Sequence, residues 1–198
     1  EMGSSGKAAL VVRTTSAPRL ESTTVISDNT WKHIVGTWDG TNTKIYINGV
    51  LENTGSLTGT IPSVTSLDIG RASNGYNFEG SISDASIFNY ALSESQVYSL
   101  YNSGSPINPM TLKPAPIAYY PLGGNASTGG DSTNTLSIPN VSVPDASVFD
   151  FDGISQYVDC GDNDAFSFGN GTSDSPFSVN FWFKTSDMTS QSLFSKLL

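Results

Sequence analysis

The sequence predicts an all-β protein, an antiparallel β-sandwich with one short surface helix near residues 93–102. Three observations support this fold class. Apolar residues make up 37% of the chain and charged residues only 14%, whereas helical proteins need many Glu, Lys and Arg residues on their outer faces. Several segments alternate between apolar and polar residues with the period of a strand. Clusters of turn-forming residues separate these segments.

The alternating segments define the expected strands. They lie around residues 31–38, 43–52, 66–70, 81–89, 147–152, 156–160, 176–184 and 192–197, and residues 8–12 form a further short apolar run. Asn48-Gly49 sits between two alternating arms and tolerates the positive φ angles of a type I′ hairpin turn. The segment 176–184 (PFSVNFWFK) predicts a strand buried on one face and nearly buried on the other. The expected core residues are Trp31, Val35, Ile45, Ile47, Phe149, Phe151, Phe177, Val179 and Phe181.

The single helix is predicted from its end signals. Ser93 and Gln96 have the spacing of a capping box, and Leu92 and Val97 can form a hydrophobic staple across the helix start. Gly104 is a natural C-terminal stop. The pattern predicts a short helix that lies on a sheet.

Charge and cysteine content restrict the expected partners. The net charge is −9, and the nine Lys and Arg residues are scattered along the chain. Nucleic acids and anionic membranes are bound by clustered Lys and Arg, so neither is an expected partner. No apolar run approaches the ~20 residues that cross a bilayer, so membrane insertion is not expected. Cys160 is the only cysteine, which rules out an intrachain disulfide.

Prolines divide the chain almost in half. Residues 103–116 hold four of the ten prolines. Because proline cannot continue a strand ladder, residues 105–116 are expected to form an extended linker. The linker separates a first segment, residues 1–104, from a second segment, residues 117–198.

The order of several motifs resembles a known family. Residues 31–40 (WKHIVGTWDG), 44–50 (KIYINGV), 67–70, 78–85 and 88–93 resemble the C-terminal half of the laminin-G-like jelly roll, in the concanavalin A-like lectin/glucanase superfamily. Residues 151–153, 156–158 and 177–184 are similar to the family's N-terminal half. The resemblance implies a jelly-roll sandwich whose two halves follow each other in reversed order.

Half a sandwich exposes an apolar sheet face and open strand edges, so each segment needs a partner. Two arrangements meet this need. The chain is either a circular permutation whose halves close on each other, or one in which flanking repeats or copies of the chain complete each half. Because neither end carries a cap, the second arrangement, an array or polymer, is the preferred expectation.

No catalytic residues are expected, and the chain is expected not to be an enzyme. Glycoside hydrolysis needs two carboxylates on opposite sides of the scissile bond, and the Glu residues are isolated in the sequence. Asp150 and Asp152 share a strand face at a strand end, where turn or metal chemistry is the simpler interpretation. His33 is the only histidine and is expected to be structural, and Cys160 is expected to be a small buried residue.

The resemblance implies one cofactor, a structural calcium ion. Asp84 and Asp152 match positions at which some family members hold calcium, a cation that takes about six to eight oxygen ligands. A second acidic loop contains Asp159, Asp162 and Asp164. The alternative interpretation is that these residues simply favour turns.

Sugar sites combine planar aromatic rings with hydrogen-bonding side chains. The candidate ligand-binding residues are Trp38, Asn74, Tyr76 and Asn77, which fall in or near loops. Trp31 and Trp182 lie in strand contexts typical of a core. The alternative is that all the aromatic residues are core or scattered over the surface.

The expected functions are binding and assembly. The first hypothesis is a carbohydrate-binding or adhesion module of a surface or virion protein, with a cell-surface or extracellular glycan as partner. The second is a purely structural repeat of a virion fibre, a decoration protein or an extracellular filament. A third is an accessory domain of a polysaccharide-degrading enzyme. The expected location is extracellular, on a cell surface or on a virion.

Overall fold

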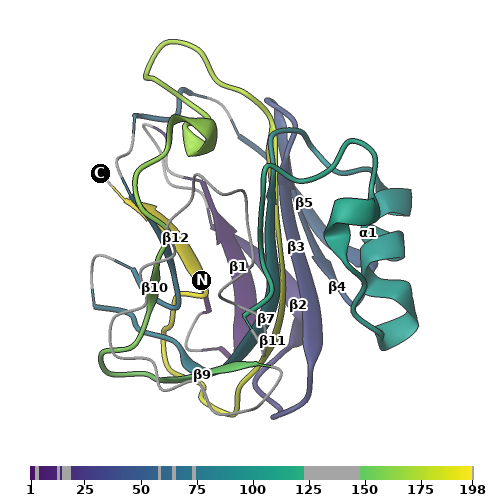
Figure 1. Ribbon diagram of the computed structural model, residues 1–198, viewed down its shortest axis with the longest axis vertical. Coiled ribbons are helices and arrows are strands. Elements are labelled where there is room, and N and C mark those ends of the chain that lie inside the picture. Colours follow the sequence, from purple (N-terminus) through teal and green to yellow (C-terminus); the bar gives the residue numbers. More distant parts are fainter. Residues whose placement is uncertain are drawn as a thin grey trace.

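The computed structural model describes residues 1–2, 5–12, 14, 19–57, 59–63, 66–72, 75–122 and 148–197. These residues form a β-sandwich in which a seven-stranded antiparallel sheet faces two smaller antiparallel sheets (Figure 1). Helix α1 covers part of the outer face of the large sheet. The predicted all-β class with one short helix is confirmed.

The large sheet has the strand order β5, β4, β3, β11, β7 and β8, and β9 also pairs with β7. Its strands are β3 (Lys32–Trp38), β4 (Asn42–Ile47), β5 (Val50–Ser56), β7 (Glu79–Phe88), β8 (Ala118–Tyr120), β9 (Phe149–Asp152) and β11 (Phe177–Lys184). Asn48 and Gly49 adopt φ angles of 49° and 77° between β4 and β5. Both angles are positive, as the predicted hairpin turn requires.

The second layer consists of two separate sheets. One pairs β1 (Lys7–Val11) with β2 (Arg19–Val25), and the other has the order β10 (Val158–Asp159), β6 (Ser66–Ile69) and β12 (Phe194–Leu197). The sequence pattern did not predict β2. Most of its residues are polar and only Ser22 is buried, so it lacks the alternation that marks a half-buried strand.

Strands from the two segments of the chain alternate within the large sheet. β11, from the second segment, lies between β3 and β7 of the first, with Phe181 opposite Ile34 and Phe183 opposite Ile82. The two segments complete one sandwich within a single chain, so the preferred expectation of an array is wrong for this structure. The reason lies in β11 itself, because a strand buried on both faces is stable only inside a sheet.

The core between the layers contains most of the predicted residues. Those buried there are Ile45, Ile47, Phe149, Phe151, Phe177, Val179 and Phe181. Val35 is buried on the opposite face of the sheet, in a second apolar cluster under α1. Trp31 is the exception, since it is 37% exposed, and its place in the predicted core is wrong.

Helix α1 (Glu94–Tyr101) begins as predicted. The Ser93 hydroxyl accepts a hydrogen bond from the backbone N–H of Gln96, and the Gln96 side chain accepts one from the backbone N–H of Ser93. Val97 and Leu100 are buried against the outer face of the large sheet. No helix of the described residues is long and apolar enough to cross a membrane.

Residues 105–116 are not the extended linker that the prolines predicted. They contain a 3-10 turn at Pro109–Thr111, and Ile107 and Leu112 pack against the apolar cluster under α1. The Tyr90 hydroxyl donates a hydrogen bond to the carbonyl oxygen of Pro114 at 2.6 Å. The segment is a packed crossover, because its apolar side chains have a sheet face to cover.

Candidate functional site

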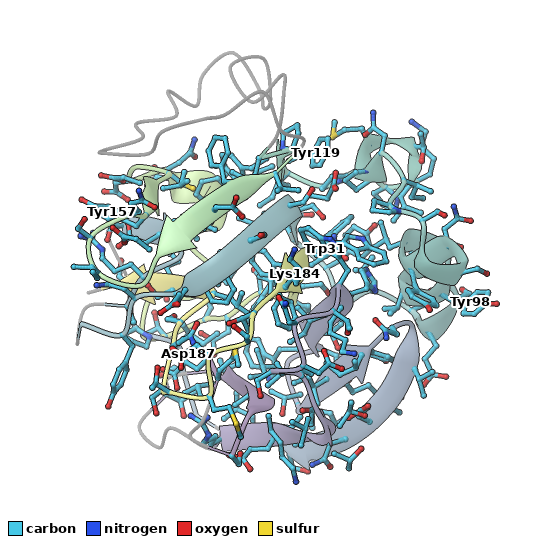
Figure 2. All side chains as sticks on the ribbon, turned by 90° about the horizontal axis from the view of Figure 1, so that it is seen from below. Trp31, Tyr98, Tyr119, Tyr157, Lys184 and Asp187 are labelled. Carbon is cyan, nitrogen blue, oxygen red and sulfur yellow. The ribbon has the colours of Figure 1, made fainter. Side chains whose placement is uncertain are left out.

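Four side chains form a row across the outer face of the large sheet. Lys184 of β11 pairs with Ser81 of β7, and Ser81 pairs with Asp150 of β9. Trp31 directly precedes β3 and extends the row on the other side of Lys184, in the register of the β3–β11 pair. Neighbouring strands lie about 4.8 Å apart, so this Trp31–Asp150 row spans roughly 14 Å. Figure 2 shows Trp31 and Lys184 close together.

Trp31 is exposed because α1 covers the neighbouring residues Trp182 and His33 but ends before it reaches Trp31. Tyr101, the last residue of α1, stacks on Trp182 with ring centroids 6.0 Å apart and lies 5.9 Å from the His33 ring. Trp182 and His33 are therefore buried although they face outward. Trp31 shares their face of the sheet but lies beyond Tyr101, so much of its indole remains in contact with solvent.

The other three side chains of the row place hydrogen-bonding groups beside the indole of Trp31. The Lys184 ammonium lies 5.8 Å from the centroid of the Trp31 ring, within the range of a cation–π contact. The Ser81 hydroxyl donates a hydrogen bond to Oδ1 of the exposed Asp150. An exposed indole beside an ammonium, a hydroxyl and a carboxylate can stack on the apolar face of a sugar ring and hydrogen-bond its hydroxyl groups.

The sequence-predicted ligand residues are not brought together into one site. Trp38 ends β3 with 1% exposure, so its ring faces the core and cannot stack on a ligand. That prediction is wrong because the strand extends through Trp38 and the loop begins after it. Asn74 lies outside the described residues. Tyr76 is 43% exposed and Asn77 is half-buried, both in the connection between β6 and β7.

Tyr76 and Asn77 belong to a second surface, beyond β9. The Asn77 side-chain amide donates a hydrogen bond to the carbonyl oxygen of Ile154 at 2.5 Å, which joins their loop to the turn after β9. Arg71 of the same loop lies over the Tyr157 ring, 3.3 Å from its centroid. Tyr157 and Trp31 lie on opposite sides of the β7–β9 pair (Figure 2). The loop surface and the Trp31–Asp150 row are therefore separate candidates.

The carboxylates of Asp84 and Asp152 already have hydrogen-bond donors. Asp84 accepts hydrogen bonds from the hydroxyls of Tyr119 and Ser83, each at 2.6 Å. Burial, followed by the nearby Asp84 carboxylate, raises the pKa of Tyr119, so its phenol stays protonated and donates. Oδ1 of Asp152 accepts hydrogen bonds from the backbone N–H groups of residues 154, 155 and 156, and these lower its pKa.

Asp84 and Asp152 lie too far apart to bind the same calcium ion. Asp152 lies opposite Glu79, and Asp84 is five residues further along β7, which corresponds to roughly 16 Å of strand. Within the described ranges no group of three His, Cys, Asp or Glu side chains is placed to hold a metal ion. The hydrogen bonds of Asp152 are those of a turn, which was the alternative interpretation of the sequence.

The two candidate nucleophiles or bases occupy structural positions. His33 is fully buried, and burial lowers its pKa to about 4. Cys160 is buried, and burial raises the pKa of its thiol to about 12. At neutral pH the imidazole is uncharged and enclosed, and the thiol is protonated, so neither is prepared to attack a substrate.

The Trp31–Asp150 row could not be identified from local sequence patterns. In the period of a strand, Trp31 shares a face with Val35, and that face is buried where α1 covers it. Whether the cover reaches Trp31 depends on where α1 ends. The other members of the row come from β7, β9 and β11, at least 50 residues away from Trp31 in the sequence, so no local pattern could join them.

Comparison with known proteins agrees with the fold. Residues 2–98 match a laminin G family model described as the concanavalin A-like lectin/glucanases superfamily. No curated protein and no solved structure matches the chain. The matched residues run from β1 into α1, so the assignment of residues 117–198 to the family's N-terminal half stays a prediction. Residues 2–98 of this chain belong to the concanavalin A-like lectin/glucanase superfamily.

Proposed function

We propose that this chain is a non-catalytic carbohydrate-binding or adhesion module of a surface or virion protein, and that it binds its glycan through the Trp31–Asp150 row. The observation that carries the proposal is the exposed indole of Trp31 beside Lys184 on the face of a sheet. Lys184, Ser81 and Asp150 lie on paired strands and Trp31 directly precedes β3, so less order has to be imposed on binding than for side chains on loops. A superfamily that includes lectins is consistent with a sugar ligand.

The net charge of the protein restricts the class of glycan that we expect it to bind. The chain carries a net charge of −9, and its overall field repels polyanions. Lys184 is the cation of the row, and the Asp150 carboxylate lies two strands away from it. A neutral oligosaccharide that stacks on Trp31 and donates hydroxyl hydrogen bonds to Asp150 suits this arrangement better than a sulfated or uronic-acid polymer.

A glycan array with matched variants tests the proposal. We expect the unaltered protein to bind neutral glycans, and Trp31→Ala to weaken that binding by about tenfold or more, the loss typical of a central aromatic contact. Tyr76→Ala removes the most exposed aromatic ring of the loop surface and serves as the control, with binding expected within about twofold of the unaltered protein. Circular dichroism verifies that both variants are folded.

Two outcomes would contradict the proposal. Loss of binding in Tyr76→Ala but not in Trp31→Ala would move the site to the loop surface. Failure to bind any glycan at millimolar concentration would reject the carbohydrate-binding function and favour the structural repeat as the second candidate. That candidate has its own supporting observation, because the described part of the second layer consists of two separate sheets rather than one.

The proposal assigns no catalytic role. Glu79 and Asp152 lie opposite each other across β7 and β9, but a glycosidase needs one carboxyl group held protonated. The backbone hydrogen bonds to Asp152 lower its pKa, so Asp152 is not held protonated as that acid. Incubation with soluble β-glucans should release no reducing ends, and a release that Asp152→Asn abolishes would overturn this part of the proposal.

The same binding surface would serve an accessory domain of a polysaccharide-degrading enzyme. Binding to insoluble polysaccharide in a pull-down, without binding to cell-surface glycans, would favour that role over adhesion. In each of these roles we place the module outside the cell, on a cell surface or on a virion.

A further inference from the structure

Trp31 lies just outside the ladder that holds its partner in the row. β3 begins at Lys32 and β11 ends at Lys184, the residue opposite Trp31 in the register of the β3–β11 pair. The end of a ladder is where backbone pairing opens most easily. The orientation of the exposed indole beside Lys184 (Figure 2) therefore depends on contacts of the loop that leads into β3.

The residues on either side of Trp31 are joined by one carboxylate. Oδ1 of Asp28 accepts hydrogen bonds from the backbone N–H of Thr30 at 3.1 Å and from its hydroxyl at 2.6 Å. Oδ2 of Asp28 accepts a hydrogen bond from the Lys32 ammonium at 2.7 Å. The ammonium also donates to the Thr30 hydroxyl at 2.7 Å. Asp28, Thr30 and Lys32 thus form a closed triangle of hydrogen bonds, which we call the Asp28 brace.

The Asp28 brace lies on the side of the chain away from the Trp31–Asp150 row. Side chains alternate along a strand, so Lys32 and Trp31 point to opposite sides. Lys32 shares the side of Ile34, which belongs to the core between the layers, whereas Trp31 shares the side of Val35. The brace therefore grips the backbone from behind, and it leaves the outward face of the indole available for stacking.

A backbone hydrogen bond fastens the same loop to β11. The N–H of Asn29 donates to the carbonyl oxygen of Thr185 at 2.9 Å, and Thr185 directly follows Lys184. Asn29 has a φ angle of 57°, in the left-handed region that few residues other than glycine adopt. Such a conformation persists where the surrounding contacts hold it in place. The loop is thus fixed to both of the strands that present Trp31 and Lys184.

The Asp28 brace is a firmer restraint than an isolated surface ion pair. Hydrogen bonds from Lys32, followed by those from Thr30, lower the pKa of Asp28 to about 2, so the carboxylate stays charged near neutral pH. The Lys32 side chain is only 13% exposed. Single exposed ion pairs contribute little to stability, but ion pairs within a hydrogen-bonded network contribute more. Three mutually bonded side chains therefore restrict the backbone on both sides of Trp31.

We propose that Asp28 is a positioning residue for glycan binding: through Thr30 and Lys32 it fixes the backbone around Trp31 and so holds the indole in the orientation on which a sugar ring stacks. The inference rests on the glycan binding proposed above for the Trp31–Asp150 row. A side chain that is held in its binding conformation before the ligand arrives loses less freedom when the ligand binds. Asp28 itself does not contact the glycan in this arrangement.

Affinity measurements test the role of Asp28. The probe is the neutral glycan that gives the strongest array signal with the unaltered protein, titrated by calorimetry. We expect Asp28→Ala to weaken binding about fivefold, which corresponds to the net contribution of roughly one hydrogen bond. Asp28→Asn keeps an oxygen that can accept from Thr30, and should restore part of the lost affinity.

Asp39 offers a matched control at the other end of β3. It is an exposed aspartate whose Oδ1 accepts hydrogen bonds from the backbone N–H groups of Thr41 and Asn42, at 2.9 and 2.7 Å. Asp39→Ala removes a comparable turn, remote from Trp31 along the strand. It should therefore lower stability without changing the affinity for the glycan.

A double-mutant cycle shows whether Asp28 acts through Trp31. In a Trp31→Ala background, Asp28→Ala should cause no further loss of affinity, because the side chain that it positions is gone. NMR relaxation of the Trp31 indole N–H gives a second readout, and its signal is distinguished by solvent exposure because Trp38 and Trp182 are buried. We expect a lower order parameter for this indole in Asp28→Ala and an unchanged one in Asp39→Ala.

The contrary results are distinct. Unchanged affinity in Asp28→Ala would overturn the positioning role and leave the proposed glycan binding intact. Equal weakening by Asp28→Ala and Asp39→Ala, or equal weakening with and without Trp31, would indicate a general effect on the fold and would also overturn it. If the unaltered protein binds no neutral glycan, the proposed function fails. The order parameter of the indole then decides on its own whether Asp28 fixes Trp31.

Discussion

The Nε2 atom of His33 lies 2.5 Å from Oδ1 of Asn180, between two strands that come from opposite ends of the chain. The Asn180 amide nitrogen donates in turn to the Ser86 hydroxyl at 3.0 Å, so three adjacent strands share one buried polar network. The imidazole must carry its proton on Nε2 to donate to the amide oxygen. Burial outweighs this hydrogen bond and lowers the pKa of His33 to about 4.

The first prediction is therefore a shifted titration of His33. Since the chain has one histidine, its imidazole signals in an NMR titration need no assignment, and we expect a midpoint near 4. The folded pKa lies below the unfolded value of 6.5, so the unfolded state binds the proton first. Stability should be full above pH 6.5 and fall by up to roughly 3 kcal/mol as the pH drops towards 4. A midpoint near 6.5 would show that the ring is solvated.

The second prediction concerns the core residue Phe181. Its ring lies 5.5 Å from that of Phe194 in the second layer, and the residue is 3% exposed. Phe181→Ala should lower the free energy of unfolding by ~3–5 kcal/mol, because it removes apolar contacts between the layers. Val50→Ala, at a position 63% exposed, should change stability by less than about 0.5 kcal/mol. Equal effects in urea unfolding would contradict the assignment of the core.

The third prediction separates steric overlap from backbone strain at two glycines. A Cβ at Gly80 would lie 2.2 Å from the carbonyl oxygen of Lys184, whereas at Gly75 it would meet no atom of the described residues within 4 Å. Both residues have positive φ angles, of 137° and 82°. Gly75→Ala should cost about 1–2 kcal/mol from strain alone, and Gly80→Ala clearly more, since backbone must also move. Thermal melts of both variants measure the difference, and similar melting points would contradict the close packing of β7 on β11.

The fourth prediction concerns the thiol of Cys160. Because the side chain is buried and burial raises its pKa to about 12, little thiolate exists at pH 8. Labelling by a thiol reagent should proceed at the rate at which the protein opens, and should become fast in denaturant. Rapid labelling of the native protein would mean that the layer formed by β10 and β6 is open near Cys160.

The fifth prediction concerns calcium. Asp84 and Asp152 lie far apart along β7 and already accept hydrogen bonds. In a buffer that contains calcium, addition of a chelator should change the melting temperature by less than about 1 °C. An ion stabilises the protein only when it binds the folded state. A larger shift that Asp152→Asn or Asp84→Asn removes would restore the calcium site that the family resemblance implied.

The sequence by itself determined the local structure of this protein. The alternation of β11, the Asn48-Gly49 turn and the Ser93 capping box each specify a strand, a hairpin or a helix start from neighbouring residues alone. They do so because the backbone conformation and the facing of side chains repeat over two to four residues. The same local signals identified the fold class, and most of the residues that they placed in the core are buried between the layers.

Only the tertiary structure decided which faces of the sheet are covered and which strands pair. Trp31 and Val35 lie on the same face of the sheet, yet α1 covers Val35 and ends before it reaches Trp31. The polar strand β2 exists because β1 pairs with it. In the described part of the chain, the second layer is built of two separate sheets. Each of these features depends on residues far apart in the chain, and burial and pairing are properties of the neighbours that folding supplies rather than of a local sequence pattern.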